Sequence, residues 1–244
     1  MEVQKRPFQE NSPIFLRNMK NIQSSIISYI EDNENLEEKF AIISDQIDNY
    51  KFIDNIDEMK IIFQLIVNIS NNCHRYSDFW EKIEQILKLF KNAICDNFTN
   101  EEIYDIFQSN KRILLFLMEE NILAIDKKCC VKLFSQNSIK FKYPHYFSTE
   151  IRQFANEKWF NKNLLKKIKD FDFETIPDNF NELRKTGENE SLICKLICDD
   201  SVDEFDDFLQ SNNIPVNTKI NASIYETNEL LQRTNEISLI IFQC

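Results

Sequence analysis

The chain has 244 residues, of which 43% are hydrophobic and 12% aromatic, so it can bury a large core. Its 40 acidic and 29 basic side chains give a formal net charge of −11, which disfavours nucleic-acid binding as a property of the whole surface. The single glycine, Gly187, excludes glycine-rich nucleotide-binding loops and disfavours β architectures, whose tight turns need residues with positive φ. We therefore predict an all-α fold.

The N-terminal sequence MEVQKRPFQENSP is polar and lacks the apolar core of a signal peptide. The most apolar window, residues 61–69, is far shorter than the ~18–20 residues that cross a bilayer. We therefore predict a cytoplasmic protein. In that compartment the seven cysteines are expected to be reduced thiols rather than a disulfide framework.

Apolar residues recur at three- and four-residue spacing through the first half of the chain, as in amphipathic helices. The first predicted helix begins at Pro13, behind a cap at Ser12, and the second begins near Asn35. Further helices are predicted over residues 56–73, after Ser77 and Asp78, after a cap at Thr99, and over 111–120 and 126–136. This succession favours stacked helix pairs over a single bundle.

The middle of the chain is basic. Residues 111–169 hold 13 Lys or Arg against 5 Asp or Glu, a net of +8, so the total of −11 leaves −19 for the rest. After an irregular stretch at 137–148, a lysine-rich helix is predicted over 150–170. It interleaves Lys158, Trp159, Lys162, Lys166 and Lys167, which suits an acidic protein, an anionic membrane or RNA. The simpler interpretation is the solvated face of a helix whose apolar side lies in the core.

The stretch ESLICKLICDDSVDEFDDFLQSNNIPVN, residues 190–217, places two cysteines four apart beside six acids. A helix over 190–198 is apolar nearly all round, so Cys194 and Cys198 are predicted core residues. Ser201 and Glu204 predict a capping box that opens a second helix. Its apolar face holds Val202, Phe205, Phe208 and Leu209, and its solvated face holds Asp203, Glu204, Asp206 and Asp207. Residues 202–212 of this helix parallel residues 111–121, because each segment ends in an asparagine and is followed by an isoleucine in the exit loop.

No residue pattern in the sequence predicts catalysis, a cofactor or a metal. A zinc site would need further ligands at familiar spacing, and the chain has no CxxC pair. Cys73 and His74 are adjacent, and on a helix their side chains point about 100° apart, which disfavours a nucleophile–base pair. His145, in the run YPHYF, could belong to a binding loop, but packing of the aromatic residues around a turn is the simpler interpretation.

The runs KTGENESLICKLI at 185–197 and DSVDEF at 200–205 resemble the junction region of a large family of protist ankyrin-repeat proteins. The segments KIEQILK at 82–88 and SNKRILLFL at 109–117 resemble that family's N-terminal helical domain of unknown function. The resemblance implies a helical domain, residues 1–176, followed by an ankyrin-like helix pair and an incomplete repeat, residues 177–244. It also implies an array that binds other proteins. The sequence departs from the pattern after residue 240, and it contains no TPLHxA motif.

We therefore expect a non-catalytic protein–protein interaction module, a scaffold or adaptor without a cofactor. The alternative is a helical domain that binds RNA or anionic lipid through residues 158–169. Self-association through residues 238–244 is also expected, because end repeats with exposed apolar faces usually need a cap. The candidate partner-binding residues are Lys158, Trp159, Lys162, Lys166, Lys167, Asp203, Glu204, Asp206 and Asp207.

Overall fold

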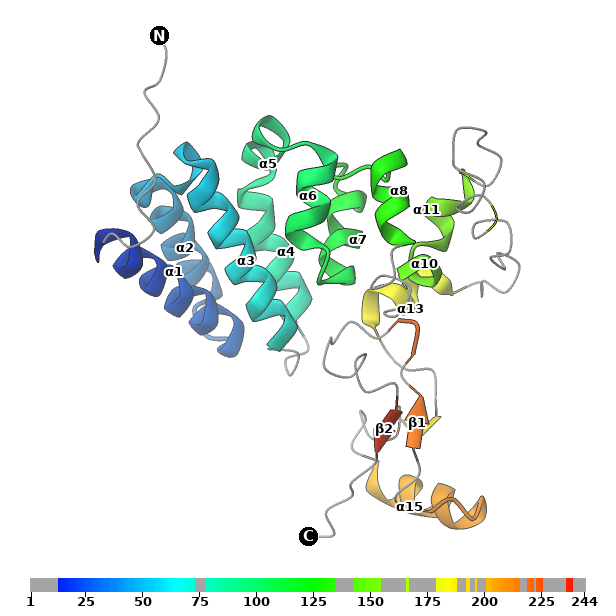
Figure 1. The fold of residues 1–244 in the computed structure, drawn as a ribbon. Helices are drawn as coiled ribbons and strands as arrows, with labels where there is room; N and C mark the ends of the chain where they lie inside the picture. The colour runs from blue at the N-terminus through cyan, green and yellow to red at the C-terminus, as the bar shows by residue number, and fades with distance from the viewer. Residues whose placement is uncertain are drawn as a thin grey trace. The chain divides into compact units, whose positions relative to one another are not determined.

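The computed structural model describes residues 13–72, 78–134, 143–154, 166, 179–187, 192–193, 196, 201–215, 219–221, 223–225 and 236–238. These residues are helical apart from turns and one small two-stranded sheet, which confirms the prediction of an all-α fold of stacked helices (Figure 1). The chain divides into two compact units, unit 1 over Met1–Ala124 and unit 2 over Ile125–Cys244. Each unit is described by itself.

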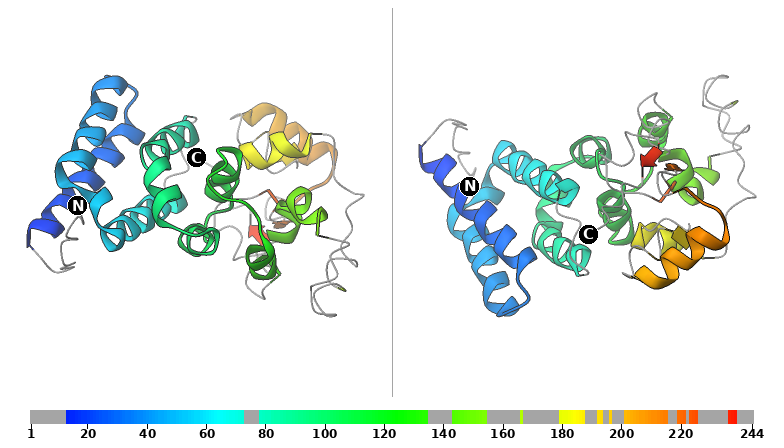
Figure 2. Two further views of the ribbon diagram at one scale, coloured as in Figure 1. Left: turned by 90° about the horizontal axis from the view of Figure 1, so that it is seen from above. Right: turned by 90° about the horizontal axis from the view of Figure 1, so that it is seen from below.

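The described part of unit 1 contains consecutive helices. Helix α1 packs against α2 and also contacts α3 and α4, and α6 packs against α3 and α7 (Figure 2). The helices begin close to the predicted positions, but the short helix α5 was not predicted. Their bounds are α1 Pro13–Glu31, α2 Leu36–Tyr50, the 3-10 turn η1 Phe52–Asp54, α3 Ile56–Asn72, α4 Phe79–Leu89, α5 Lys91–Asn97, α6 Asn100–Phe107 and α7 Lys111–Glu119.

The core of unit 1 is built from the periodic apolar residues. Phe63 of α3 is fully buried, and its ring lies 5.3 Å from that of Phe90, 5.9 Å from Phe98 and 5.4 Å from Phe107. Each such aromatic pair adds about 0.5–1.5 kcal/mol to the free energy gained by burying the rings. This cluster therefore fixes how α3 packs against α6 and against the turns that flank α5.

Two side chains start helices in unit 1 as capping rules require. The predicted cap at Thr99 is confirmed as a full capping box, in which Thr99 accepts from the Glu102 amide and the Glu102 carboxylate accepts from the Thr99 amide. Asn110 caps α7 by accepting from the Ile113 amide at 3.0 Å, and its side-chain amide donates to Asn71 at 2.8 Å. The buried Asn110 thus ties the start of α7 to the end of α3.

Unit 2 contains shorter elements. The stretch 137–148, predicted as irregular, holds α10 and the first residue of α11, because Tyr143 and Tyr146 fold inward on one turn of helix. A small antiparallel ladder, which was not predicted, pairs Ile220 with Ile237. The elements are α8 Lys127–Leu133, α10 Tyr143–Tyr146, α11 Ser148–Arg152, α13 Phe180–Thr186, α15 Val202–Ser211, β1 Lys219–Asn221 and β2 Glu236–Ser238.

Arg184 holds three helices of unit 2 together. It is only 5% exposed, and its guanidinium donates to both oxygens of Glu150 at 2.9 Å and to the carbonyl oxygen of Tyr146 at 3.2 Å. The Tyr146 hydroxyl in turn donates to the carbonyl oxygen of Arg184 at 2.7 Å. Helix α13 is therefore bound to α10 and α11, which precede it by more than thirty residues.

The predicted domain boundary near residue 176 lies outside the described residues and inside unit 2. The chain divides between Ala124 and Ile125, where the backbone stops donating hydrogen bonds to unit 1. The amides of Ile122 and Leu123 donate back to α7, and that of Ala124 donates to the Asn100 side chain at 3.2 Å. The next cap, Asp126, already serves α8.

Helices α7 and α15, whose sequences are similar, also end with the same hydrogen-bond pattern. In each, an asparagine adopts a left-handed conformation, Asn121 with φ 58° and Asn213 with φ 52°. The following amide donates to the carbonyl oxygen five residues earlier, at 2.8 Å for Ile122 and 2.9 Å for Ile214. The left-handed residue that follows α15 is thus Asn213, one position after the asparagine that ends the similar segment 202–212.

Candidate functional site

Helix α15 carries the acidic half of the predicted partner-binding residues. Asp203, Glu204, Asp206 and Asp207 are all exposed, as predicted, and the helix contains no basic residue. Asp203 and Glu204 lie in the first turn, where the helix dipole favours negative charge. Asp206 and Asp207 lie beyond that turn, so the dipole does not account for them. Within the described residues none of the four carboxylates forms an ion pair.

The opposite face of α15 anchors the helix. Phe205 and Leu209 are buried against Ile193 and Leu196, with Phe208 and Ile214 half-buried beside them. This packing holds the helix backbone in place beneath the four carboxylates. The acidic side chains therefore project from a supported helix, and we call them together the α15 acidic face.

Two predictions about the start of α15 are wrong. Ser201 is the residue before the helix, but its side chain makes no capping hydrogen bond, because its backbone, with ψ 71°, departs from the extended geometry that the Thr99 box adopts at ψ 160°. Val202 is 62% exposed rather than part of the buried face, since the first turn extends beyond the cluster around Phe205. The N-terminus of α15 is thus more open to solvent than predicted.

The basic half of the predicted site lies mostly outside the described residues. Lys158, Trp159, Lys162 and Lys167 are not described, and Lys166 is an exposed helical residue. Lys111 and Arg112, counted within the basic middle of the sequence, are 1% and 6% exposed. Arg112 forms an ion pair with Glu84. These two cations therefore contribute little to any basic surface.

Cys129, Cys130 and the aromatic residues beside His145 are packing residues. Cys129 and Cys130 are buried free thiols, and burial raises the pKa of each to about 12, which makes them poor nucleophiles at neutral pH. His145 is exposed while its aromatic neighbours are buried, as a packed turn requires. Cys73, His74, Cys194 and Cys198 lie outside the described residues.

The prediction that residues 190–198 are buried all round is wrong at one position. Leu192 is 51% exposed, whereas Ile193 and Leu196 pack into the cluster beneath α15. Of the three described residues of this segment, two therefore face the cluster and Leu192 faces solvent.

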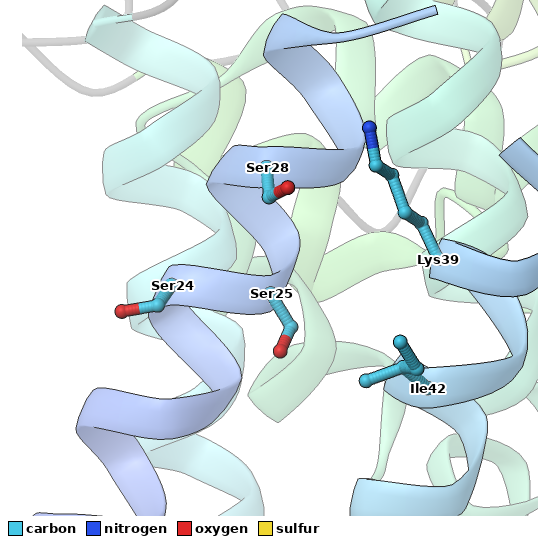
Figure 3. A pocket seen from close by; sticks show the side chains of 5 residues that line it. All are labelled: Ser24, Ser25, Ser28, Lys39 and Ile42. Atoms are coloured by element: carbon cyan, nitrogen blue, oxygen red, sulfur yellow. The ribbon is translucent and has the colours of Figure 1, made fainter. Parts of the chain in front are cut away.

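A shallow pocket in unit 1 was not predicted from the sequence. It has a volume of about 200 Å³ and lies between α1 and α2 (Figure 3). Serines on α1 form one wall, and the stem of Lys39 and the side chain of Ile42, 43% exposed, form the other. Periodicity did not indicate this pocket, because small polar residues on an exposed helix face give no distinctive pattern.

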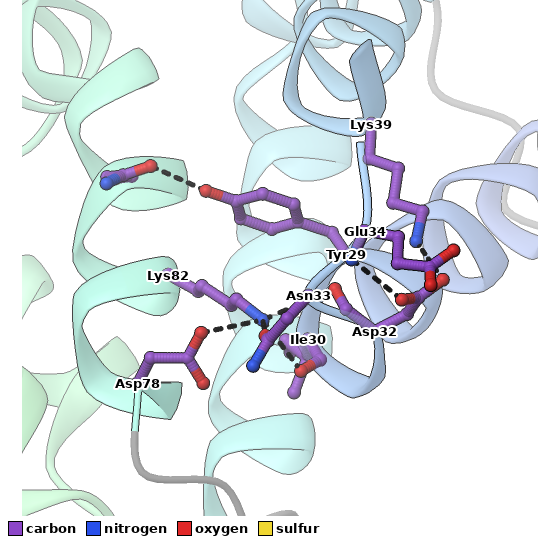
Figure 4. Close-up of polar contacts among 9 residues, drawn as sticks. Tyr29, Ile30, Asp32, Asn33, Glu34, Lys39, Asp78 and Lys82 are labelled. Carbon is purple, nitrogen blue, oxygen red and sulfur yellow. Dashed lines mark hydrogen bonds and ion pairs between the residues drawn. The ribbon is translucent and has the colours of Figure 1, made fainter. Parts of the chain in front are cut away.

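Lys82 of α4 forms a buried polar centre at the end of α1 (Figure 4). Its side chain is 3% exposed, and its ammonium donates to the Ile30 carbonyl oxygen at 3.1 Å and to Asn33 Oδ1 at 2.6 Å. It also pairs with Asp78 at 2.9 Å and lies 5.7 Å from the centre of the Tyr29 ring. The ammonium thus sits at the C-terminus of α1, where the helix dipole favours a cation.

The turn between α1 and α2 carries a second ion pair. Lys39 donates to Asp32, and this hydrogen bond holds the pKa of the Asp32 carboxyl below its usual range. The Tyr29 hydroxyl donates to Gln85 at 2.5 Å, and burial raises the pKa of that phenol. These contacts are tertiary and explain why the turn is ordered, but they form no reactive arrangement.

Within the part of the chain that the structure describes, no group of three or more His, Cys, Asp or Glu side chains could hold a metal ion. No helix among the described residues is both long and apolar enough to cross a membrane. Comparison with protein-family models, curated proteins and solved structures gives no match for this chain. The α15 acidic face is the candidate functional site that the geometry supports best.

Proposed function

We propose that this protein is a non-catalytic interaction module that binds a basic segment of another protein through the α15 acidic face. The observation that supports the proposal is the closeness of these four carboxylates, whose repulsion lowers the stability of the free protein. Asp203 precedes Asp206 and Asp207 by three and four residues on the helix, and Glu204 precedes Asp207 by three, so these side chains are neighbours on its surface. Like charges at these spacings destabilise a helix by about 0.2–0.5 kcal/mol per pair, about 1 kcal/mol in all.

A bound cation would remove this repulsion. Lysine or arginine side chains of a partner would lie between carboxylates that face solvent and are already held on a packed helix, so little ordering would accompany binding. Negative charge concentrated on one face also accelerates encounter with a cationic partner at low salt. Val202, exposed at the edge of the face, offers one apolar contact beside the charges.

The test compares the full chain with a variant that removes the four charges with little change of shape, Asp203→Asn, Glu204→Gln, Asp206→Asn and Asp207→Asn. A matched control neutralises Asp54, Asp57, Glu81 and Asp96 in the same way. The control set has the same three Asp and one Glu, all exposed, with two in first turns of helices. Both variants therefore change the net charge equally and differ only in where on the surface the charges are removed.

Immobilised wild-type and variant chains are used to capture proteins from a nuclease-treated lysate, which are identified by mass spectrometry. We expect a protein retained by the wild type and the control but not by the α15 variant, with a purified interaction that weakens as salt rises. Equal retention by all three chains would contradict a role for α15. Retention of RNA alone, when nuclease is omitted, would favour the alternative site at residues 158–169 instead.

A further inference from the structure

Four serine or threonine residues in the described part of the chain stand three positions before an acidic residue. A carboxylate at this distance is a charge pattern by which a protein kinase with a basic substrate groove selects its target hydroxyl. One of the four, Ser201, has six acidic residues within six positions on either side, and each of the others has fewer. The four are Ser28, Thr99, Ser201 and Ser223.

The structure separates these hydroxyl groups by what they already bind. Thr99 Oγ1 donates to the Glu102 carboxylate at 2.9 Å and accepts from the Glu102 amide. Ser223 Oγ accepts from the Tyr225 amide at 3.1 Å. The Ser201 hydroxyl makes no capping hydrogen bond, and no hydrogen bond joins it to another described residue. Ser201 is also partly exposed, so solvent reaches it.

The residues after the hydroxyl also differ, and they matter because a kinase groove takes its substrate as an extended segment. The three residues that follow Ser201, 202–204, are all exposed, so drawing them out of the first turn of α15 uncovers no core side chain. After Ser28, by contrast, come Tyr29 and Ile30, which are 3% and 1% exposed. Exposed helix ends open at a lower free energy than buried segments do, so Ser201 is the accessible acceptor.

We propose that Ser201 is phosphorylated by a kinase that recognises acidic segments, and that the phosphate strengthens the α15 acidic face. In the transfer, Ser201 Oγ attacks the γ-phosphorus of ATP, and a new Oγ–P bond replaces the bond from that phosphorus to the bridging oxygen of ADP. The hydroxyl proton passes to the catalytic carboxylate of the kinase. This protein therefore supplies only the acceptor oxygen, and ATP and the kinase are the co-reactants.

A phosphate on Ser201 lies next to the acidic face, since Asp203 and Glu204 are in the helical turn that follows. The group adds a charge of about −1.5 to −2 at pH 7, and the positive end of the helix dipole offsets its repulsion by these two carboxylates. This second part rests on the proposed function, because a more negative face matters only if α15 binds a basic segment. We expect the affinity for a cationic probe to rise about 3- to 10-fold.

The test incubates the full chain with magnesium ATP and a purified acid-directed serine/threonine kinase, and peptide mass spectrometry locates and quantifies the phosphate. We expect phosphate at Ser201 first. Ser201→Ala should remove it without moving the urea unfolding midpoint, since the hydroxyl makes no capping hydrogen bond. The variant with the four α15 acids neutralised should be modified at Ser201 at least ~10-fold more slowly. The matched control of the capture experiment should be modified at the wild-type rate.

Three outcomes would overturn phosphorylation at Ser201. The kinase could leave Ser201 unmodified, or modify it equally fast when the four α15 acids are neutralised. It could also modify Thr99 or Ser223 before Ser201, which would show that bound hydroxyl groups are not protected. A fluorescent oligolysine peptide tests the second part, and equal binding to the phosphorylated and untreated chains would overturn it. These measurements do not involve a captured protein, so they succeed or fail separately from the capture experiment.

Discussion

Replacing Lys82 with methionine should lower the free energy of unfolding of unit 1 by about 3 kcal/mol. Methionine keeps most of the apolar stem of lysine but removes the ammonium that Figure 4 shows between α1 and α4. The change leaves the Ile30 carbonyl oxygen without its charged donor and Asp78 without its ion pair. It therefore tests whether the end of α1 depends on a charge supplied by another helix.

The magnitude follows from the burial of each partner. A hydrogen bond to a charged group contributes about 1.5–3 kcal/mol, and Lys82, its side chain 3% exposed, makes one at 3.1 Å and one at 2.6 Å. Breaking a fully buried ion pair costs about 3–5 kcal/mol, but Asp78 is 27% exposed and can be partly hydrated after the change. The loss of the hydrogen bonds therefore dominates. Asp78→Asn, which spares them, should cost only about 1 kcal/mol.

Urea unfolding followed by far-UV circular dichroism measures these differences, and hydrogen exchange in the last turn of α1 locates them. The matched control is Lys88→Met on the same helix. Lys88 also pairs with a carboxylate, Glu120 at 3.2 Å, but it is 52% exposed. We expect the control to change stability by no more than about 1 kcal/mol.

The reasoning would be refuted if Lys82→Met and Lys88→Met destabilised the protein equally. It would also be refuted if combining Lys82→Met with Asp78→Asn cost the sum of the two single changes, because a shared ion pair requires coupling between them. A large loss without faster exchange at the end of α1 would mean that the ammonium acts somewhere other than at the Ile30 carbonyl.

Three further changes have defined outcomes. Thr99→Ala should cost about 1 kcal/mol at pH 7 by removing the capping box, as measured by urea unfolding. Hydrogen bonds from Thr99 lower the pKa of Glu102 in the folded protein, so the ionised carboxylate stabilises the fold above its unfolded pKa of about 4.3. The cost of Thr99→Ala should therefore shrink as the pH falls through the lowered pKa of folded Glu102. Arg184→Met should cost about 3 kcal/mol in unit 2, because the buried guanidinium has charged and backbone partners. Cys129 and Cys130 should resist iodoacetamide in the folded protein at mildly alkaline pH, as judged by peptide mass spectrometry, because burial keeps them protonated.

Each of these predictions has its own control. For the capping box, a Thr99→Ser chain should retain most of the stability, and a cost that is the same in acid would exclude the Glu102 contribution. For Arg184, a lysine should recover only part of the loss, since its one nitrogen cannot replace both guanidinium nitrogens, which donate to Glu150, Tyr146 and Asn181. For the buried thiols, the exposed Cys95 should be alkylated in the same sample. Labelling at Cys129 as fast as at Cys95 would contradict its burial.

The helices of unit 1 could be predicted because each buries one apolar stripe, and a stripe repeats in the sequence every three or four residues. Helix α5 was missed because Phe90, Ala93 and Ile94 continue the apolar pattern of α4 without a break. The α15 acidic face could likewise be predicted, since four acids opposite Phe205 and Leu209 leave the helix only one orientation toward a core.

The features that could not be predicted depend on contacts between residues far apart in the sequence. Lys111 and Lys82 look like solvated charges in any local window, and only the packing of other helices makes them buried. Ser201 and Thr99 occupy the same capping pattern, yet only Thr99 adopts the backbone geometry that lets the side chain reach the helix. The pocket between α1 and α2 depends on how two helices approach each other, and side-chain periodicity carries no signal for that.

The Arg184 contacts restrict how the gene for this protein could be rearranged. An exchange that joined the residues after 176 to a different N-terminal half would carry α13 away from Glu150 and Tyr146. A buried guanidinium would then lack its counter-charge, which is costly enough to unfold a small unit. A junction near Ala124 separates no such pair among the described residues, so recombination at that point would transfer α8 through α15 together as one heritable piece.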